Sequence, residues 1–317
     1  MTKPCGIVIH GGAGTILQSK MTPEKEACIR ETLTEALYVG IAVLQKGHGA
    51  LGAVQKAVNV MENSPLFNAG RGAVFTHDGI NEQDATIMDG FTGKAGAVAG
   101  VRRIANPIDL AKQVMCHSPH VLLMGEGAEQ FAVEQGFKLV DKDYFYTDQR
   151  WEQLQALLAK EQAAGENKKG GLPLALSEDD KHGTVGAVAL DKMGGLAAAT
   201  SSGGMTNKRY GRVGDSSCVG AGTYADKLCA VSTTGHGEFF MRGVVAYDIA
   251  ARMRYGGMSL SQAAEASVQT SLTDREGTGG LIAIDKDGNF ALPFNTEGMY
   301  RGHLMQGTEP VVKIFRE

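Results

Sequence analysis

Hydroxyl groups cluster beside glycines in the second half of the sequence. Thr184 opens an apolar run directly after a polar stretch, in HGTVGAVA at 182–189, and TSSGG at 200–204 ends the next apolar run. A threonine alone is ordinary in a strand. Its hydroxyl becomes a useful nucleophile when a base lies beside it, and the free α-amine of an N-terminal threonine is such a base, with a reference pKa of about 7.7–8.0. This chemistry at Thr184 requires that the chain first be cut after Gly183.

Two further glycine-rich segments carry charged or hydroxyl groups. GRVGDS at 211–216 brings Arg212 and Asp215 into one loop. TTGHGE at 233–238 places glycine N–H groups at an expected helix start, where an anion is stabilised. From these residues alone, an ion pair between Arg212 and Asp215 on the surface is the preferred interpretation.

Familiar motifs from other classes of protein fail. HGGAG at 10–14 is similar to the oxyanion loop of α/β-hydrolases, but the sequence holds no G-x-S-x-G elbow, and the same glycines do not fit G-x-G-x-x-G. GFTGK at 90–94 lacks the spacing of a P-loop. DKDGN at 285–289 begins like a calcium loop but lacks the glutamate at its twelfth position. His117 and His120, with a proline between them, do not predict a transition-metal site.

Composition narrows the class of protein. The 317 residues carry a formal net charge of −4, which gives no reason to expect nucleic acid or an anionic membrane as a partner. Five cysteines without a C-x-x-C pair are typical of a reduced, cytoplasmic protein. The first residues do not resemble a secretory signal, and no apolar stretch approaches the roughly 20 residues that span a bilayer. We therefore expect a cytoplasmic protein.

The elements that must hold these residues come in blocks of strands and helices. Helices are predicted over 23–46, 50–63, 107–115, after Gly125, and over 151–164, 238–255 and 260–272. Strands are predicted over 5–9 ahead of a glycine loop, over 69–76, within 84–101, and as the hairpin pairs 184–190 with 196–201 and 281–284 with 290–294. The stretch 165–182 mixes glycine, proline and charges, which is typical of an exposed linker. This order predicts an α+β protein rather than a doubly wound parallel sheet.

Many ordered segments make the sequence similar to a known family. It resembles the plant-type L-asparaginase and isoaspartyl aminopeptidase family of N-terminal-nucleophile hydrolases along nearly its whole length. The segments that carry the resemblance are HGGAG at 10–14, SPLFNAGRGAVF at 64–75, DATIMDG at 84–90, KAGAVAGV at 94–101, SPHVLLMGEGAE at 118–129, GTVGAVALD at 183–191, GRVGDS at 211–216 and PFNTEGMYR at 293–301.

The resemblance implies catalytic roles around the expected cut between Gly183 and Thr184. Thr184 would be both the autoproteolytic and the catalytic nucleophile. Ser202 stands where the family has a threonine that hydrogen-bonds this nucleophile, and serine keeps the hydroxyl. Thr234 and Gly235 match the oxyanion hole, which stabilises charge that develops on the substrate oxygen.

The resemblance also implies how substrate and a cation would be bound. Arg212 would hold the substrate α-carboxylate and Asp215 its α-ammonium, while Thr234, Gly235 and Gly237 would line the pocket. These partners select L-asparagine and β-aspartyl dipeptides, which share one head group. No cofactor is expected for catalysis. A structural sodium ion is expected on the backbone carbonyls of Met61, Glu62, Ser64, Phe67, Ala69 and Arg71.

The implied fold is an α+β, four-layer αββα sandwich. Autoproteolysis would divide the chain into an α chain (1–183) and a β chain (184–317), assembled as an (αβ)2 heterotetramer. Three alternatives stay open: a glycosylasparaginase-like specificity, a threonine protease that acts on folded protein, and a non-catalytic binding protein that never matures.

Overall fold

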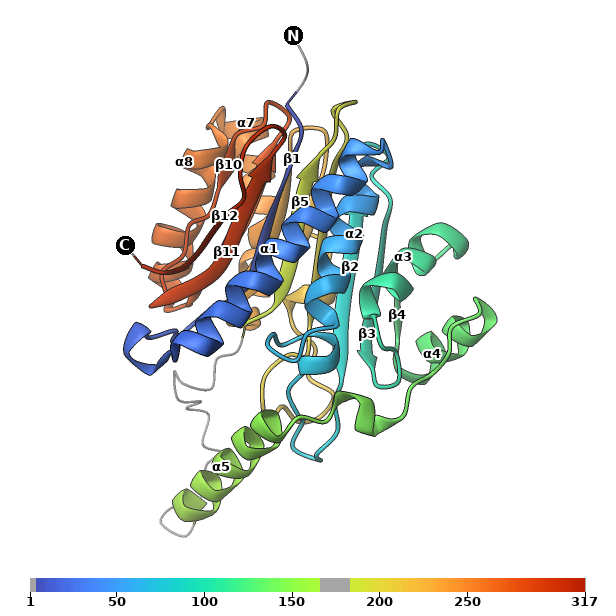
Figure 1. Cartoon of the computed structure of the whole chain (residues 1–317), viewed down its shortest axis with the longest axis vertical. Helices are drawn as coiled ribbons and strands as arrows, with labels where there is room; N and C mark the ends of the chain where they lie inside the picture. Colours follow the sequence, from blue (N-terminus) through green and yellow to red (C-terminus); the bar gives the residue numbers. More distant parts are fainter. Residues whose placement is uncertain (1–3, 166–182, 317) are drawn as a thin grey trace.

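Two β-sheets lie face to face between layers of helices in the computed structural model, which describes residues 4–165 and 183–316 (Figure 1). Within these residues the larger sheet has eight strands in the order β12-β11-β1-β5-β6-β2-β3-β4, and the smaller has four in the order β10-β9-β8-β7. The strands are β1 (Gly6–Gly14), β2 (Gln83–Asp89), β3 (Ala95–Val101), β4 (Leu122–Met124), β5 (Val185–Leu190), β6 (Leu196–Ser202), β7 (Thr223–Ala225), β8 (Cys229–Gly235), β9 (Gly279–Asp285), β10 (Phe290–Ala291), β11 (Gly298–Met305) and β12 (Val311–Phe315). The α-helices are α1 (Pro23–Gln45), α2 (Gly49–Glu62), α3 (Pro107–His117), α4 (Gly125–Glu134), α5 (Asp148–Gly165), α6 (Gly237–Gly243), α7 (Val245–Gly256) and α8 (Leu260–Glu265).

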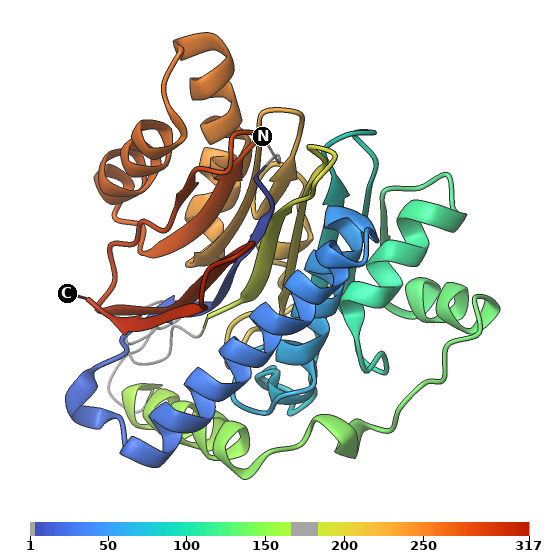
Figure 2. The ribbon, with the colours of Figure 1, turned by 45° about the horizontal axis from the view of Figure 1, so that its top comes forward.

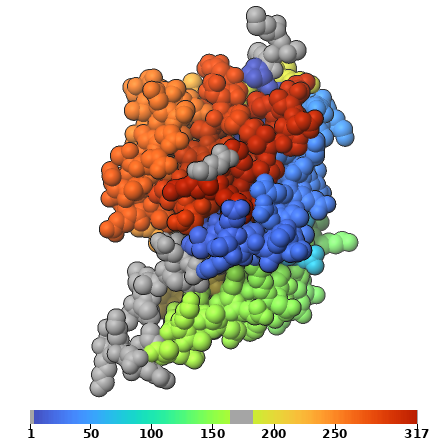
Figure 3. All heavy atoms as spheres, turned by 60° about the vertical axis from the view of Figure 1, so that its left-hand side comes forward, coloured from blue at the N-terminus to red at the C-terminus, as the bar shows by residue number. Residues whose placement is uncertain are grey.

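Apolar clusters between the layers hold them together. One lies between the helices α1, α2 and α3 and the larger sheet, a second between the two sheets, and a third between the smaller sheet and the helices α7 and α8. Figure 2 shows the N-terminal helices (blue and green) on one side and the C-terminal helices (orange) on the other. On the face shown in Figure 3, the C-terminal elements (orange to red) lie beside the N-terminal helical region (blue). The predicted α+β, four-layer αββα sandwich is therefore confirmed.

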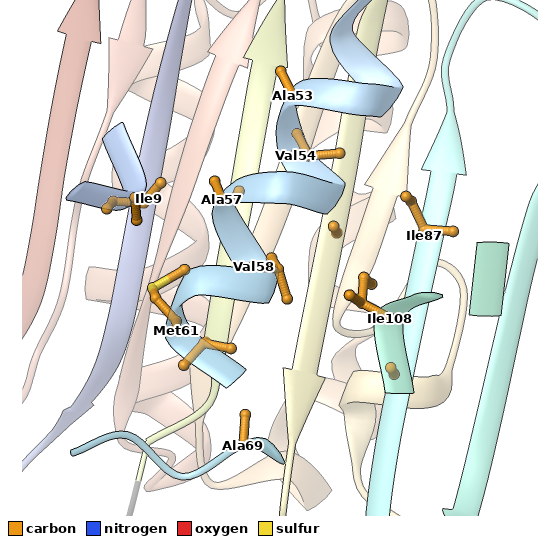
Figure 4. Packing of buried hydrophobic residues seen from close by; sticks show 14 of the residues in the cluster. Ile9, Ala53, Val54, Ala57, Val58, Met61, Ala69, Ile87 and Ile108 are labelled. Atoms are coloured by element: carbon orange, nitrogen blue, oxygen red, sulfur yellow. The ribbon is translucent and has the colours of Figure 1, made fainter. Parts of the chain in front are cut away.

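Helix α2 shows how helical periodicity fixes the larger sheet. Val54, Val58 and Met61 recur at spacings of four and three residues and are fully buried. They cover the sheet between Ile9 of β1 and Ile87 of β2 (Figure 4). Burying a side chain of this size contributes about 1.5–3 kcal/mol. This packing holds the strands that carry the catalytic candidates.

Side-chain alternation along β5 and β6 decides what reaches the space between the sheets. On β5, Ala187 packs under the helices whereas Val188 faces the smaller sheet. Thr184 has the parity of Val188 and so faces the smaller sheet. On the antiparallel neighbour β6, Ser202 has the parity of Ala198, which also faces the smaller sheet. The hairpin therefore brings the two hydroxyls together.

Two strand predictions are wrong. The glycines after 5–9 do not form a loop, because β1 continues through Gly14 by pairing with β11, with a bulge between His10 and Gly12. The predicted strand 69–76 is a tight turn with a 3-10 segment at 70–72. Gly70 has a φ of 54°, a left-handed conformation that favours glycine and turns the chain at this point.

The C-terminal helices are shorter than predicted. The expected helix 238–255 breaks at Val244, whose φ of 48° separates α6 from α7. The break lets backbone N–H groups at the start of α7 donate to the carbonyls of Gly220 and Ala221 in a distant loop. The second expected helix, 260–272, is α8 followed by a π-helix over Ala266–Leu272.

The two chains expected from a cut at 183/184 contribute strands to the same sheet. β1 pairs with β5 and β2 pairs with β6, so segments before and after Gly183 share the larger sheet. The predicted linker 165–182 lies outside the described residues except for Gly165, the last residue of α5. The division into two chains stays a prediction. Of the helices in the described part of the chain, none combines the length and apolar character needed to cross a bilayer.

Candidate active site

Thr184 is held by hydrogen bonds from three sides. Its hydroxyl donates to Ser202 Oγ at 3.1 Å, and its N–H donates to Thr234 Oγ1 at 3.1 Å. Its carbonyl oxygen lies 2.8 Å from Nδ1 of His10, a residue to which the sequence alone gave no role. Thr184 is 5% exposed. The hydroxyl therefore has a fixed direction, as a nucleophile requires.

The two hydroxyl partners of Thr184 come from different sheets. Ser202 ends β6, and its Oγ also accepts from the N–H of Gly204 at 2.9 Å. Thr234 lies on β8, and its Oγ1 also accepts from the N–H of Ala13 at 3.2 Å. Both lone pairs of the Thr234 hydroxyl are thus engaged, so its remaining capacity is to donate its proton, although Thr234 is fully buried.

A narrow cleft joins most of the predicted site residues. Its volume is about 20 Å³, and its lining includes Thr184, Ser202, Arg212, Asp215 and Gly235. Gly235 has a φ of 143°, and an added Cβ would lie 2.4 Å from the carbonyl oxygen of Thr278. Glycine is therefore required where the backbone borders the cleft. A cleft this small has room for about one water molecule, which disfavours the alternative of a protease acting on folded protein.

Arg212 is oriented by Glu238, another residue that the sequence reasoning missed. Nε and Nη2 of Arg212 donate to the two carboxylate oxygens at 2.8 Å each, and Nε2 of His236 lies 3.2 Å from Oε2. Burial would raise the pKa of Glu238, but the hydrogen bonds from His236 and Arg212 hold that pKa far below its usual range. Among the described residues nothing hydrogen-bonds Nη1, so the edge formed by Nη1 and Nη2 is open to a carboxylate.

Two glycines make room around this guanidinium. A Cβ on Gly214 would lie 2.8 Å from Nη1 of Arg212. A Cβ on Gly237 would lie 2.9 Å from Nη2 of Arg212 and 2.7 Å from Oδ1 of Asp215. The structure thus brings Gly237 against both charged groups, although Gly237 is not among the residues that line the cleft, and its role in the substrate pocket stays a prediction.

Asp215 is a buried carboxylate at the cleft. It is 4% exposed, and its Oδ2 accepts from the Thr233 hydroxyl at 2.7 Å. Burial raises its pKa to about 6, although the Thr233 hydrogen bond and the charge of Arg212 act in the opposite direction. A buried carboxylate with one hydroxyl donor has capacity to accept from an ammonium group.

A second carboxylate, Asp84 on β2, lines the same cleft. It is 1% exposed and accepts from the backbone N–H groups of Gly100 at 2.9 Å and Gly214 at 3.4 Å. Burial raises its pKa, while the positive charge of Lys208 lowers it. Sequence alone predicts no site role for Asp84; the signal that could have marked it is an acidic side chain inside an apolar strand.

The segment 61–71, where sodium was expected, folds back on itself after α2. A Cβ on Gly70 would lie 2.2 Å from the carbonyl oxygen of Glu62, and one on Gly72 would lie 2.1 Å from that of Phe67. Carbonyl oxygens are hard ligands of the kind that a hard cation prefers, and a sodium ion at this segment stays a prediction. Within the described residues no group of three or more His, Cys, Asp or Glu side chains could hold a metal ion.

The fold and the site together define a class of protein. A four-layer αββα sandwich with a hydroxyl residue at the head of a central strand is the fold of the N-terminal-nucleophile hydrolases.

A family model described as Asparaginase matches residues 2–314. The chain is 53% identical over 312 residues to the isoaspartyl peptidase of Salmonella typhimurium, covering 98% of each chain. It is 53% identical over 312 residues to the isoaspartyl peptidase of Escherichia coli, covering 98% of this chain and 96% of the other. It is 41% identical over 294 residues to the isoaspartyl peptidase/L-asparaginase of Rattus norvegicus, covering 92% and 84%. The chain therefore belongs to the asparaginase family.

Proposed function

We propose that this protein hydrolyses β-aspartyl dipeptides and L-asparagine, with Thr184 as an N-terminal nucleophile. The observation that carries the proposal is one cleft lined by a hydrogen-bonded Thr184, an arginine with an open edge and a buried aspartate. The relatives named isoaspartyl peptidase or isoaspartyl peptidase/L-asparaginase support the same activity.

Maturation comes first in this mechanism. The Thr184 hydroxyl adds to the carbonyl carbon of Gly183, the C–N bond between the two residues breaks, and an ester forms. Water then hydrolyses the ester, leaving a carboxylate on Gly183 and a free amine on Thr184. Gly183 packs against Gly12, where a Cβ would be 2.1 Å from the Gly12 Cα, so neither position has room for a side chain.

The free amine then acts as the base for hydrolysis. It takes the hydroxyl proton of Thr184 as Oγ1 attacks the β-carbonyl carbon of the substrate. The hydroxyl of Thr234 and the N–H of Gly235 would donate to the resulting oxyanion. The leaving amine takes the proton and departs as ammonia or as an amino acid. Water hydrolyses the aspartyl ester and restores Thr184.

Recognition of the head group explains the substrate class. The open edge of Arg212 would bind the α-carboxylate bidentately, and Asp215 would bind the α-ammonium. Both contacts are made to groups that L-asparagine and β-aspartyl dipeptides share. In an α-aspartyl peptide the α-carboxyl is an amide, which offers Arg212 no carboxylate.

Three further features belong to the proposal. A sodium ion bound by the backbone carbonyls of the 61–71 segment would stabilise that turn. The hard oxygen donors of the segment support this proposal. Assembly as an (αβ)2 heterotetramer is proposed for the matured enzyme, and light scattering after size-exclusion chromatography measures it. The proposed location is the cytoplasm, which the cysteine usage supports.

A matched pair of dipeptides tests the function. Purified protein is incubated with β-aspartyl-leucine, α-aspartyl-leucine and L-asparagine, and released aspartate is measured. We expect release from the β-linked dipeptide and from asparagine, none from the α-linked dipeptide, and none with Thr184→Ala. Equal cleavage of the two dipeptides, or full activity of Thr184→Ala, would refute the proposal. GlcNAc-asparagine in the same assay measures the glycosylasparaginase-like alternative.

A further inference from the structure

A line of buried polar side chains runs from the nucleophile into the space between the sheets. His10 Nδ1 lies 2.8 Å from the carbonyl oxygen of Thr184, and His10 Nε2 lies 2.8 Å from Ser232 Oγ. Ser232 Oγ is 2.7 Å from Thr200 Oγ1, which accepts from Thr223 Oγ1 at 2.6 Å. The residues His10, Ser232, Thr200 and Thr223 are all 0% exposed. No step of the proposed reaction uses them.

Hydrogen-bond accounting fixes the direction of the bonds at His10. A carbonyl oxygen can only accept, so the proton of His10 must be on Nδ1. Nε2 then accepts from the Ser232 hydroxyl. Beyond Ser232, the Thr200 hydroxyl has two acceptors within reach, Ser232 Oγ at 2.7 Å and the carbonyl oxygen of Gly222 at 3.2 Å. Both ring nitrogens of His10 are satisfied. Burial lowers the pKa of His10 to about 3 against the effect of its bond to Thr184, so the ring stays neutral.

The surrounding strands are built to admit the imidazole. His10 is on β1, Ser232 on β8, and Gly186 of β5 lies directly opposite His10. A Cβ at Gly186 would be 2.0 Å from Ser232 Oγ and 2.3 Å from His10 Nε2. Only glycine at that position lets the ring bridge the two sheets.

We propose that His10 is a positioning residue, which anchors Thr184 through a hydrogen bond to the carbonyl oxygen of Thr184. The inference rests on the proposed function. Before the cut, the peptide bond to Gly183 helps to fix Thr184. After the cut, Thr184 is a chain end, and its first peptide group could rotate and swing the hydroxyl and amine away from the substrate. The bond from His10 holds that peptide group from the C-terminal side. A neutral ring also avoids repelling the ammonium that forms when the amine takes the hydroxyl proton.

Two variants of His10 separate positioning from packing. His10→Leu removes both hydrogen bonds, whereas His10→Asn keeps an amide N–H near the place of Nδ1. Steady-state kinetics with β-aspartyl-leucine give KM and kcat, with kcat expressed per mole of cleaved chain so that slow maturation does not lower it. His48→Leu, at an exposed histidine before α2, is the matched control.

We expect His10→Leu to lower kcat about 10- to 100-fold with KM within about twofold, and His10→Asn to recover kcat to within about threefold of wild type. Ser232→Ala keeps the ring but removes the donor to Nε2, and we expect it to lower kcat about threefold to tenfold. It serves as the test if His10→Leu does not fold, which circular dichroism reports.

Wild-type kcat in His10→Leu, or in Ser232→Ala when the leucine variant is unfolded, would overturn the inference. Equal losses in the leucine and asparagine variants, or a loss carried by KM, would overturn it as well, because each indicates a packing role. Activity in Thr184→Ala would instead defeat the proposed function, so the two failures are distinguishable.

Discussion

The buried carboxylate of Asp215 is expected to destabilise the folded protein. Burial raises its pKa from 3.8 to about 6, so the folded chain binds this proton more tightly than the unfolded chain does. Folding is therefore disfavoured wherever the unfolded group is ionised: the effect disappears below the unfolded value, grows between pH 3.8 and about 6, and is complete above that. Asp215→Asn removes the ionisation and keeps an oxygen for the Thr233 hydroxyl.

The magnitude follows from the two pKa values. At pH 8 the change from 3.8 to about 6 corresponds to about 3 kcal/mol, so Asp215→Asn should raise the free energy of unfolding by about that amount. At pH 5 the folded Asp215 is already mostly protonated while the unfolded one is ionised, and the gain should shrink to about 1.6 kcal/mol. Activity should move in the opposite direction, with KM for a β-aspartyl dipeptide rising on the order of 100-fold, because the α-ammonium loses its partner.

Urea unfolding measures the stability difference. Both proteins carry Thr184→Ala, which keeps the chain in one piece, and circular dichroism follows unfolding at pH 5 and pH 8. A variant less stable than its parent at pH 8, or a gain of the same size at both pH values, would refute the reasoning. KM is measured for Asp215→Asn in the chain that keeps Thr184. An unchanged KM there would show that Asp215 does not bind the substrate.

Substitutions at three further positions test the site by steady-state kinetics, two of them with a control variant. Glu238→Gln should raise KM about fivefold to twentyfold with little change in kcat, because a neutral amide holds Arg212 less firmly. Gly237→Ala should raise KM about tenfold or more, since the Cβ would lie 2.9 Å from Nη2 of Arg212, whereas Gly127→Ala, with nothing within 4 Å of the added Cβ, should change neither constant. Ser202→Ala should lower kcat about 10- to 100-fold by removing the hydrogen-bond acceptor that orients the Thr184 hydroxyl, and Ser202→Thr should keep kcat within about threefold.

Each of these expectations has a contrary result. A fall in kcat larger than the rise in KM for Glu238→Gln would show that the residue acts in the chemical step rather than on binding. Equal effects of the two glycine variants would mean that the close contact at Gly237 does not matter. Full kcat in Ser202→Ala would show that the hydrogen bond from Thr184 to Ser202 does not orient the nucleophile.

Local signals were sufficient for much of the fold. The helix predicted over 23–46 is α1, Pro23–Gln45, because Thr22 caps its first turn and proline fits at its first position. Val244 gave no such signal: a β-branched residue with a φ of 48° is held there by hydrogen bonds from α7 to a loop more than twenty residues away. The sequence of a segment does not predict hydrogen-bond partners that lie far away in the chain.

The same distinction between local signals and distant partners applies to the residues of the site. The contact between Thr184 and Ser202 follows from a hairpin, whose parity can be read along the chain. His10 lies 174 residues from Thr184, and Asp84 lies 130 residues from Gly214, so these contacts exist only once the strands are ordered in the sheet. Their residue types were visible, but their partners were not.

Denaturing mass spectrometry of the purified wild type beside Thr184→Ala tests the central claim most directly. Cleavage before Thr184 predicts two wild-type fragments of about 19 and about 14 kDa, given 33.5 kDa over 317 residues, the smaller beginning with threonine, and one intact chain for the variant. An intact 33.5 kDa wild type that still releases aspartate from β-aspartyl-leucine would contradict the account.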